Sequence, residues 1–309
     1  MDTITTLSDR LAAKGVSRRD FMKFCGFMAT VLGLPISFGP RIAQAVEKKR
    51  PTVVWLNLAA CTGCTESFIR TTYPWTADIV LDLIDLAYHE TIMAAAGDQA
   101  EEILDQTVKK GDYLCICDGA IPTNDNGAYG KVHGKTFQEV VKTVTPKAAG
   151  VICVGTCASY GGVQAAAPNP TGAKTVQEVT GVKTINIPGC PPNADNIVGT
   201  IVHYLFLGKL PAVDDKGRPL FAYQYLIHDN CQKRGHYENG EFVKVFGDEG
   251  AKKGFCLFEV GCRGPETYNN CSKILWNQGT NWPIGAGHPC IGCSEPNFWD
   301  EMAPFYVKK

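Results

Sequence analysis

Residues 51–64 read PTVVWLNLAACTGC and join an apolar run to a pair of cysteines. The run at 53–58 is typical of a buried β-strand. Cys61 and Cys64 follow it as a Cys-x-x-Cys motif, which places two thiols on one tight turn. Two soft thiolates in this arrangement suit an iron–sulfur cluster, a zinc ion or a redox disulfide. The motif alone leaves all three kinds of site open.

Strand and helix patterns alternate from residue 51 to about residue 208. We expect strands at 53–58, 79–86 (as a strand or a strand–helix mixture), 113–117, 150–154 and 184–187. We expect helices at 64–72, 98–109, 135–144, 177–180 and 193–207. Apolar strands that alternate with helices are typical of α/β proteins with a doubly wound parallel sheet. The sequence therefore predicts a flavodoxin-like domain over residues 46–210.

Four cysteines lie just past the predicted carboxyl ends of three strands, namely Cys61, Cys64, Cys157 and Cys190. In a doubly wound sheet this edge is the binding crevice, so the four thiols can converge on one cofactor. Glycines beside them let the backbone approach the sulfur atoms closely. Any one of these cysteines could be a buried structural residue. Four at equivalent positions favour a shared site.

The cysteine content is the unusual feature of a chain of 309 residues with a net charge of −1. One of the 14 cysteines, Cys25, lies near the N-terminus, and the remaining 13 cannot all pair as disulfides because 13 is odd. An odd set of thiols favours metal ligation. The balanced charge provides no basic field, so we expect no nucleic-acid partner.

The N-terminal segment has the features of an export signal. Residues 17–23, SRRDFMK, form a twin-arginine pattern, an uncharged apolar run follows at 24–40, and Ala43-Gln44-Ala45 offers a small-x-small cleavage site. We interpret residues 1–45 as a Tat signal peptide and expect a periplasmic protein. A transmembrane helix is the weaker alternative, because the run is shorter than the ~20 apolar residues that a span needs and Pro35 interrupts it.

Beyond residue 210 the periodicity fades, and Gly, Pro, Asn and aromatic residues dominate. Metal-ligand spacings appear instead, with His228-x-x-Cys231 and Cys290-x-x-Cys293 as the tightest pairs. Cys256, Cys262 and Cys271 lie between them. A loop-rich segment with so little regular structure can be held together by metal clusters. We expect residues 211–309 to form a second domain of this kind.

These motifs, in this order, closely resemble the small subunit of periplasmic nickel–iron (NiFe) hydrogenases. The resemblance runs nearly the full length, from SRRDF at 17–21 to SEPNFWD at 294–300. Its most specific parts are CTGC at 61–64, GTCA at 155–158, IPGCPP at 187–192, HDNC at 228–231, GCRGP at 261–265 and HPCIGC at 288–293. The resemblance implies a heterodimeric hydrogenase in which this chain is the electron-transfer subunit.

The resemblance also implies three iron–sulfur clusters in a line. A proximal 4Fe-4S cluster would be held by Cys61, Cys64, Cys157 and Cys190. A distal 4Fe-4S cluster would be held by His228, Cys231, Cys256 and Cys262. A medial 3Fe-4S cluster would be held by Cys271, Cys290 and Cys293, with Pro283 where a fourth cysteine might be expected. Electrons would pass between the NiFe site of a separate large subunit and a cytochrome or membrane acceptor. No catalytic residue is expected in this chain.

Two further positions refine the resemblance. Oxygen-tolerant relatives carry two extra cysteines around the proximal cluster, and the matching residues here are Gly63 and Gly162, which implies oxygen sensitivity. Many relatives have a glutamate directly before the first proximal cysteine, where this chain has Ala60. The proton relay would then use another group, for which Glu66 is a candidate, or follow a different path.

Two alternative functions remain open. One is an iron–sulfur subunit of a quinone or coenzyme oxidoreductase, although such proteins share the proximal-cluster domain and lack the module at 228–293. The other is a disulfide- or zinc-stabilised exported binding protein, which the odd cysteine count, the twin-arginine pattern and the strand-end cysteines disfavour. Cys115, Cys117 and Cys153 lie within predicted strands, and we expect them to be buried as small hydrophobic residues.

Overall fold

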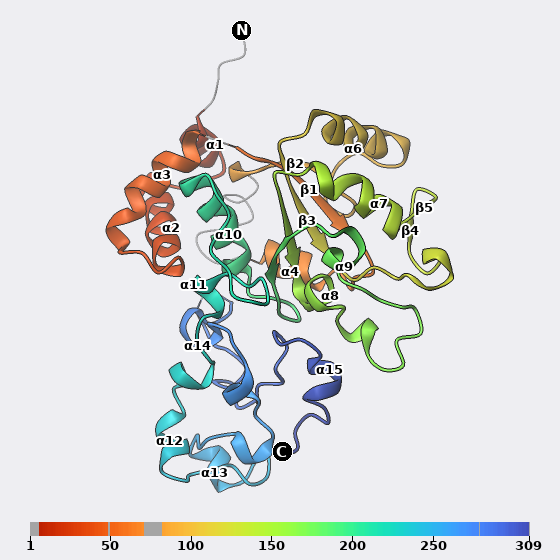
Figure 1. The fold of residues 1–309 in the computed structure, drawn as a ribbon. Helices are drawn as coiled ribbons and strands as arrows, with labels where there is room; N and C mark the ends of the chain where they lie inside the picture. Colours follow the sequence, from red (N-terminus) through yellow and green to blue (C-terminus); the bar gives the residue numbers. More distant parts are fainter. Residues whose placement is uncertain (1–5, 49, 71–81, 278, 309) are drawn as a thin grey trace.

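A five-stranded parallel sheet forms the centre of the first two thirds of the chain in this computed structural model (Figure 1). The structure describes residues 6–48, 50–70, 82–277 and 279–308. The strands are β1 (Thr52–Asn57), β2 (Asp85–His89), β3 (Tyr113–Asp118), β6 (Gly150–Val154) and β7 (Thr184–Ile187). Their spatial order is β2-β1-β3-β6-β7, and every neighbouring pair is parallel. This order confirms the predicted doubly wound sheet of the flavodoxin-like kind.

Both faces of the sheet are covered because its strands are apolar on both sides. Along β1, Val53 and Trp55 point to one face while Val54 and Leu56 point to the other. The first face packs against α4 (Gly63–Ile69) and α10 (Ala194–Leu207). The second packs against α6 (Asp98–Lys110), α7 (Phe137–Val144) and α9 (Val176–Thr180). The short helix α8 (Gly155–Tyr160) continues directly from β6.

The sequence placed most elements well but misplaced two of them. The predicted helix over 135–144 begins only at Phe137, because Thr136 caps it through a capping box with Glu139. The two residues before Phe137 form β5 (Lys135–Thr136), which pairs with β4 (Lys131–Val132). Over 79–86 we expected a strand or a strand–helix mixture, and the described part has two helical residues at 82–83 followed by β2, which starts at Asp85. Residues 79–81 of that prediction, and the end of the helix predicted at 64–72, lie outside the described residues.

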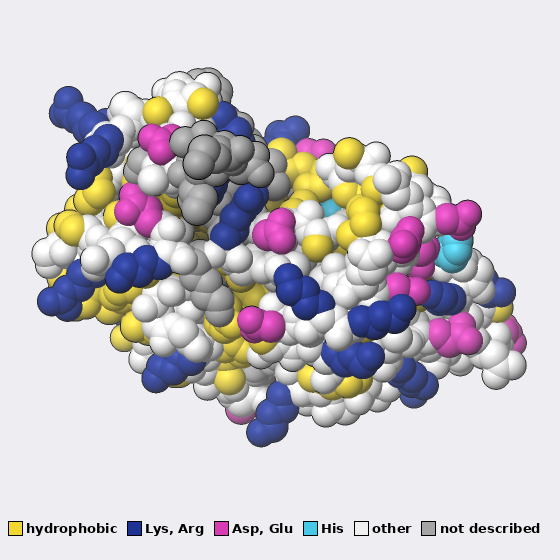
Figure 2. Space-filling model, turned by 90° about the horizontal axis from the view of Figure 1, so that it is seen from above, with side chains coloured by type: hydrophobic (Ala, Val, Ile, Leu, Met, Phe, Trp, Pro, Cys, Tyr) yellow, Lys and Arg dark blue, Asp and Glu magenta, His cyan; other side chains and the backbone are white. Residues whose placement is uncertain are grey.

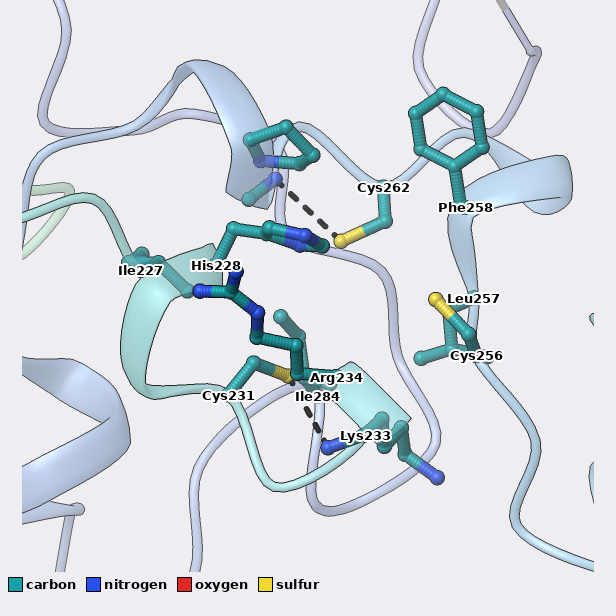
Figure 3. Close-up of a pocket in the computed structure, with 12 residues that line it drawn as sticks. Ile227, His228, Cys231, Lys233, Arg234, Cys256, Leu257, Phe258, Cys262 and Ile284 are labelled. Atoms are coloured by element: carbon teal, nitrogen blue, oxygen red, sulfur yellow. Dashed lines mark hydrogen bonds between the residues drawn. The ribbon is translucent and has the colours of Figure 1, made fainter. Parts of the chain in front are cut away.

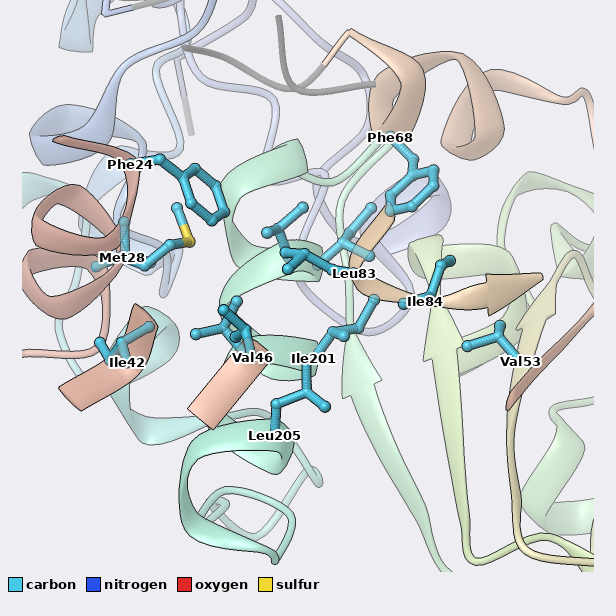
Figure 4. Packing of buried hydrophobic residues seen from close by; sticks show 14 of the residues in the cluster. Phe24, Met28, Ile42, Val46, Val53, Phe68, Leu83, Ile84, Ile201 and Leu205 are labelled. Atoms are coloured by element: carbon cyan, nitrogen blue, oxygen red, sulfur yellow. The ribbon is translucent and has the colours of Figure 1, made fainter. Parts of the chain in front are cut away.

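The N-terminal segment folds onto the body of the protein as α1 (Leu7–Ala13), α2 (Arg18–Val31) and α3 (Gly39–Lys48). Ser17 caps α2 by accepting a hydrogen bond from the backbone N–H of Asp20. Side chains of α2 and α3 then pack against α10 and extend the hydrophobic core of the sheet (Figure 4). None of the described helices is long and apolar enough to cross a membrane.

The last third of the chain consists of short helices and loops. Its helices are α11 (Leu220–Tyr223), α12 (Arg234–Glu238), α13 (Glu249–Lys252), α14 (Cys271–Ile274) and α15 (Phe298–Glu301). The 3-10 helices of the chain are η1 (Ile36–Phe38), η2 (Asn124–Gly127), η3 (Thr145–Lys147), η4 (Val163–Ala165), η5 (His228–Asn230), η6 (Phe258–Val260) and η7 (Gly264–Glu266). The separate core of this region is small and includes Val243, Leu257 and Trp282 together with Cys262 and Cys271.

Charged side chains of both signs are mixed on the molecular surface. Figure 2 shows Lys and Arg side chains next to Asp and Glu across the face that it draws, with hydrophobic side chains visible between them. Mixed charges produce a weaker local field than a patch of one sign. Large exposed hydrophobic residues such as Ile36, Val163 and Phe246 come from segments far apart in the sequence.

A buried ion pair fastens the last third of the chain to the region after α10. Arg218 Nη1 lies 2.8 Å from Glu295 Oε1, and Arg218 Nε lies 2.7 Å from Asp214 Oδ2. The backbone N–H of Tyr268 donates to Glu295 Oε1 at 2.7 Å, and the guanidinium lies 5.1 Å from the centroid of the Tyr268 ring. The Arg218 and Glu295 side chains are only 3% and 5% exposed. Their full pairing makes this buried charge tolerable.

We predict that Arg218→Met strongly destabilises the C-terminal third. The substitution leaves the buried carboxylate of Glu295 without its main partner, and breaking a buried pair in this way costs about 3–5 kcal/mol. The change in the free energy of unfolding can be measured by urea denaturation of the intact chain.

Lys216→Met is the matched control. Lys216 Nζ lies 3.2 Å from Glu295 Oε2, but the lysine side chain is 37% exposed. Removal of such a partly solvated charge costs about 1 kcal/mol or less. Equal losses of stability in the two variants would contradict the role given to Arg218.

Candidate metal centres

The carboxyl ends of β1, β6 and β7 bring Cys61, Cys64, Cys157 and Cys190 together. Cys64 lies in the first turn of α4, Cys157 lies within α8, and Cys190 follows β7. The thiols are close enough to raise one another's pKa: Cys157 and Cys61 act on Cys64, and Cys61 also acts on Cys190. Cys64 is buried, whereas Cys61 and Cys190 are exposed. The set therefore forms a site that opens at the protein surface.

Burial makes this set of thiols a poor place for negative charge. It is the main cause that raises the pKa of Cys64 well above its ordinary value and the pKa of Cys157 to about 12. Burial also raises the pKa of the Asp118 carboxyl, which hydrogen-bonds to Cys64, to about 6. Thiolates in such a place need a positive counter-charge, and bound metal ions deprotonate coordinating thiols. Among the described residues, no group of three or more His, Cys, Asp or Glu side chains is placed to hold a single metal ion. The thiol donors suit a thiolate-ligated cluster of several metal ions instead.

Two glycines keep the space around these sulfur atoms open. Gly155 has φ +87°, and a Cβ built there would lie 2.4 Å from Cys64 Sγ. Gly162 has φ +69°, and a Cβ there would lie 2.4 Å from Cys157 Sγ. Both backbone conformations favour glycine, and a side chain at either position would fill space beside a sulfur atom. The two glycines therefore leave room for the sulfur atoms of Cys64 and Cys157.

A second set of candidate ligands, His228, Cys231, Cys256 and Cys262, lines one pocket in the last third of the chain (Figure 3). The backbone N–H groups of Lys233 and Gly264 donate to Cys231 Sγ and Cys262 Sγ, both at 3.4 Å. Such donors stabilise negative charge on sulfur. Burial lowers the pKa of His228, which favours the neutral imidazole that binds metals.

A third set, Cys271, Cys290 and Cys293, lines a cavity of about 460 Å³ together with Trp282 and Pro283. Burial raises the pKa of Cys271 to about 12 and that of Cys293 to about 11. Cys190 of the first set and His288 also line this cavity. Pro283 has no side-chain donor atom, so the third set itself has three thiols where each of the other two sets has four candidate ligands. Asn269 Oδ1 accepts a hydrogen bond from Cys271 Sγ at 3.2 Å.

Direct hydrogen bonds join the first set to the third. The hydroxyl of Thr156 accepts from the backbone N–H of Gly189 at 2.9 Å and donates to the carbonyl of Cys293 at 2.5 Å. Thr156 is thus a bridge between the loop that carries Cys190 and the loop that carries Cys293. A backbone hydrogen bond from Cys190 also partly offsets the raised pKa of Cys293.

The third set is joined in the same way to the second. The backbone N–H of Arg263 donates to the carbonyl of Cys290 at 2.8 Å. A backbone hydrogen bond from Cys290 also lowers the pKa of Cys262, against the larger effect of burial. The three sets therefore form a series, with Cys271, Cys290 and Cys293 in the middle.

The remaining residues that the sequence singled out lie outside these three sets. Cys115 and Cys117 have sulfur atoms 3.7 Å apart and, with Cys153, are completely buried in the core on the α6 and α7 side of the sheet. Glu66 is exposed and forms an ion pair with Arg70 at 3.4 Å. Sequence reasoning missed the bridge formed by Thr156. Its position directly before Cys157 marks it as a residue close to the first set.

Two family models match different parts of this chain. Residues 223–306 match the family model for the C-terminal part of the NiFe/NiFeSe hydrogenase small subunit. Residues 61–204 match the model described as NADH ubiquinone oxidoreductase, 20 Kd subunit. The two matches divide the chain between the sheet domain and the loop-rich region.

Full-length relatives give the same result. The chain is 55% identical to the periplasmic [NiFe] hydrogenase small subunit of Solidesulfovibrio fructosivorans, over 96% of this chain and 95% of the relative. It is 51% identical to the quinone-reactive Ni/Fe-hydrogenase small chain of Wolinella succinogenes, over 96% and 85%. The crystal structure of a reduced, active Ni-Fe-Se hydrogenase from Desulfomicrobium baculatum superimposes with a TM-score of 0.78 at 38% identity, over 84% of this chain and 100% of that chain. The chain therefore belongs to the family of [NiFe] hydrogenase small subunits.

Proposed function

We propose that this protein holds three iron–sulfur clusters and connects the large subunit of a hydrogenase to an external electron acceptor. The proposal is carried by one observation, the series of three adjacent ligand sets joined by hydrogen bonds. When bound, the clusters supply single-electron redox chemistry. The protein supplies the ligands, their spacing and the electrostatic environment of each cluster.

The ligand assignment follows from the three sets. The proximal 4Fe-4S cluster takes Cys61, Cys64, Cys157 and Cys190. The distal 4Fe-4S cluster takes His228, Cys231, Cys256 and Cys262. The medial 3Fe-4S cluster takes Cys271, Cys290 and Cys293, because three thiols and Pro283 fit a cluster with three protein ligands. We assign the proximal site to a domain over 46–210 and the other two to a domain over 211–309.

The surroundings of each set differ in ways that tune a cluster. A neutral imidazole at His228 adds no negative charge, unlike a thiolate, and a lower ligand charge raises the reduction potential. Backbone N–H donors to Cys231 Sγ and Cys262 Sγ act in the same direction, because they stabilise electron-rich sulfur. A raised reduction potential suits the proposed distal cluster to receive electrons from the medial cluster and pass them to an acceptor. The acceptor is a cytochrome or a membrane partner in this proposal.

We assign the protein to the periplasm. The relatives from Solidesulfovibrio fructosivorans and Nitratidesulfovibrio vulgaris are both named periplasmic. The twin-arginine pattern at 17–23 supports export by the Tat route, which carries folded proteins and so allows cofactor insertion before export.

The two alternative functions are weaker. A quinone or coenzyme oxidoreductase subunit accounts for the match of residues 61–204, but it leaves the hydrogenase match at 223–306 unexplained. An exported zinc or disulfide protein is inconsistent with membership of the hydrogenase family, which the 55% identical relative establishes.

Metal analysis tests the proposal directly. We expect about eleven iron atoms and about twelve acid-labile sulfides per chain, from two four-iron clusters and one three-iron cluster. Cys271→Ser should remove the medial cluster and lower the iron content to about eight atoms. Cys115→Ala is the matched control, since Cys115 is buried outside the three sets and should leave iron unchanged. Zinc without sulfide would refute the assignment.

Thr156→Val tests the bridge between the proximal and medial sites. The substitution leaves the Gly189 N–H and the Cys293 carbonyl without their partner, which costs about 1–3 kcal/mol of stability. We expect a lower unfolding temperature and an altered electron paramagnetic resonance signal of the three-iron cluster. Thr156→Ser keeps the hydroxyl and should behave like the wild type. A valine variant with unchanged stability and spectrum would exclude a role for the bridge.

The glycines beside the proximal site predict oxygen sensitivity. Gly63 and Gly162 provide no ligand atoms, and a side chain at Gly162 would meet Cys157 Sγ at 2.4 Å. The proposed proximal cluster thus takes four cysteine ligands, with no further thiol at Gly63 or Gly162. We expect hydrogen oxidation by the purified heterodimer to stop in air and to be measurable under argon. Sustained hydrogen oxidation in air would show that oxygen tolerance arises without the extra cysteines.

A further inference from the structure

His228 differs from the other five histidines of the chain in the surroundings of its ring. Each of the others has a polar partner at a ring nitrogen, namely His89, His133, His203, His236 and His288. Within the described residues, no hydrogen bond or ion pair reaches the ring of His228. A histidine that binds a metal usually donates its other ring N–H to a second group, which fixes the orientation of the ring. Another contact has to supply that orientation here.

The ring of Tyr237 packs directly against the imidazole of His228. The two ring centroids are 4.6 Å apart and the ring planes meet at 78°, which is a favourable T-shaped contact. Tyr237 lies in α12 and is half-buried. Its hydroxyl has no hydrogen-bond partner in the described part of the chain, so the contact with His228 depends on the ring alone.

Two phenylalanines hold Tyr237 in place and connect it to a second ligand of the same set. The Tyr237 ring makes T-shaped contacts with Phe242 at 5.7 Å and with Phe258 at 5.3 Å. Phe258 lines the pocket that contains the distal ligands (Figure 3). Phe242 forms a β-bridge with Cys256, and backbone hydrogen bonds on both sides of it fasten the two segments together. The aromatic cluster therefore fixes His228 relative to the segment that carries Cys256.

The charged neighbour of His228 cannot orient the ring in the usual way. Arg234 lies beside the imidazole (Figure 3), but a guanidinium has only donor groups and cannot accept a ring N–H. Arg234 is also paired with Glu238 at 2.9 Å and with Asp229 at 3.7 Å. Packing by Tyr237 is thus the direct contact that determines the plane of the imidazole.

We propose that Tyr237 is the positioning residue of the distal site, and that its ring holds the His228 imidazole in the plane in which one nitrogen faces the cluster. The inference rests on the distal ligand set of the proposed function. A carboxylate or carbonyl partner would orient the ring but also make it more basic. An aromatic ring orients it without that effect, so His228 stays a neutral and weaker donor, which agrees with a raised reduction potential.

Substitutions of Tyr237 in the heterodimer, prepared with ¹⁵N-labelled histidine, test the proposal. Pulsed electron paramagnetic resonance of the dithionite-reduced protein measures the coupling between the histidine nitrogen and the distal cluster. Tyr237→Leu removes the ring and should weaken this coupling about twofold or more. Tyr237→Phe keeps the ring and should match the wild type. An unchanged coupling in Tyr237→Leu, or an equal loss in Tyr237→Phe, overturns the proposal.

The iron content of the same samples gives a second readout. An iron atom without its protein ligand is lost as Fe²⁺, and ferricyanide then removes one electron from the remaining three-iron cluster to give its paramagnetic form. In Tyr237→Leu we expect the three-iron signal to rise from about one spin toward about two spins per chain, with the loss of about one iron atom. Loss of the medial three-iron signal as well would show that Tyr237 supports the whole domain, which overturns a specific role at His228.

Phe255→Leu is the matched control. Phe255 lies in the same region, and its ring contacts a different histidine, His236, at 5.2 Å. His236 is also fixed by Glu241, at 2.7 Å from its Nδ1 atom. The control should leave the nitrogen coupling and the iron content unchanged. Equal changes in Phe255→Leu and Tyr237→Leu would trace the effect to loosened packing in general and overturn the proposal.

The wild-type heterodimer separates this inference from the proposed function. A wild type with the expected iron and a histidine coupling, combined with an unaffected Tyr237→Leu variant, contradicts only the role of Tyr237. A wild type without a histidine coupling contradicts the distal ligand set itself.

Discussion

The electrostatic cost of burying thiolates is the constraint on which the rest of the structure depends. Cys64, Cys157, Cys271 and Cys293 all have their pKa values raised, with burial as the largest cause. A protein that only needed small apolar side chains at these places would gain nothing from grouping them at strand ends and in cavities. Bound metal would compensate for this cost, and in the C-terminal third the free energy of metal binding would replace part of a normal hydrophobic core.

Much of the sheet domain could be predicted because local sequence dictates it. Strands β6 and β7 have the predicted bounds, since each is a short apolar run bordered by turn residues. The convergence of Cys61, Cys157 and Cys190 follows from topology, because parallel strands share one carboxyl edge. The β5 strand was missed because Lys135 and Thr136 fit a helix equally well. Their pairing with β4 comes from the turn between them, which the helical periodicity does not reveal.

The contacts that connect the sites were beyond sequence reasoning. Thr156 and Cys293 are 137 residues apart, and Arg218 and Glu295 are 77 apart. Neither pair leaves a periodic pattern, because a hydrogen bond between loops depends on the final fold. The packing of residues 7–48 on α10 was hidden for a related reason. An apolar run of this kind fits a signal peptide and a surface helix equally well. Only the tertiary structure shows which surface its side chains cover.

Two different kinds of contact hold the N-terminal segment and the C-terminal third in place. At the C-terminal end, Arg218 and Glu295 form a fully paired, directional contact that no other surface can imitate, which suits a permanent connection. At the N-terminal end, α2 and α3 are held mainly by hydrophobic contact, which any complementary apolar surface can replace. A directional, fully paired contact and a non-directional hydrophobic contact therefore hold different parts of the chain in place.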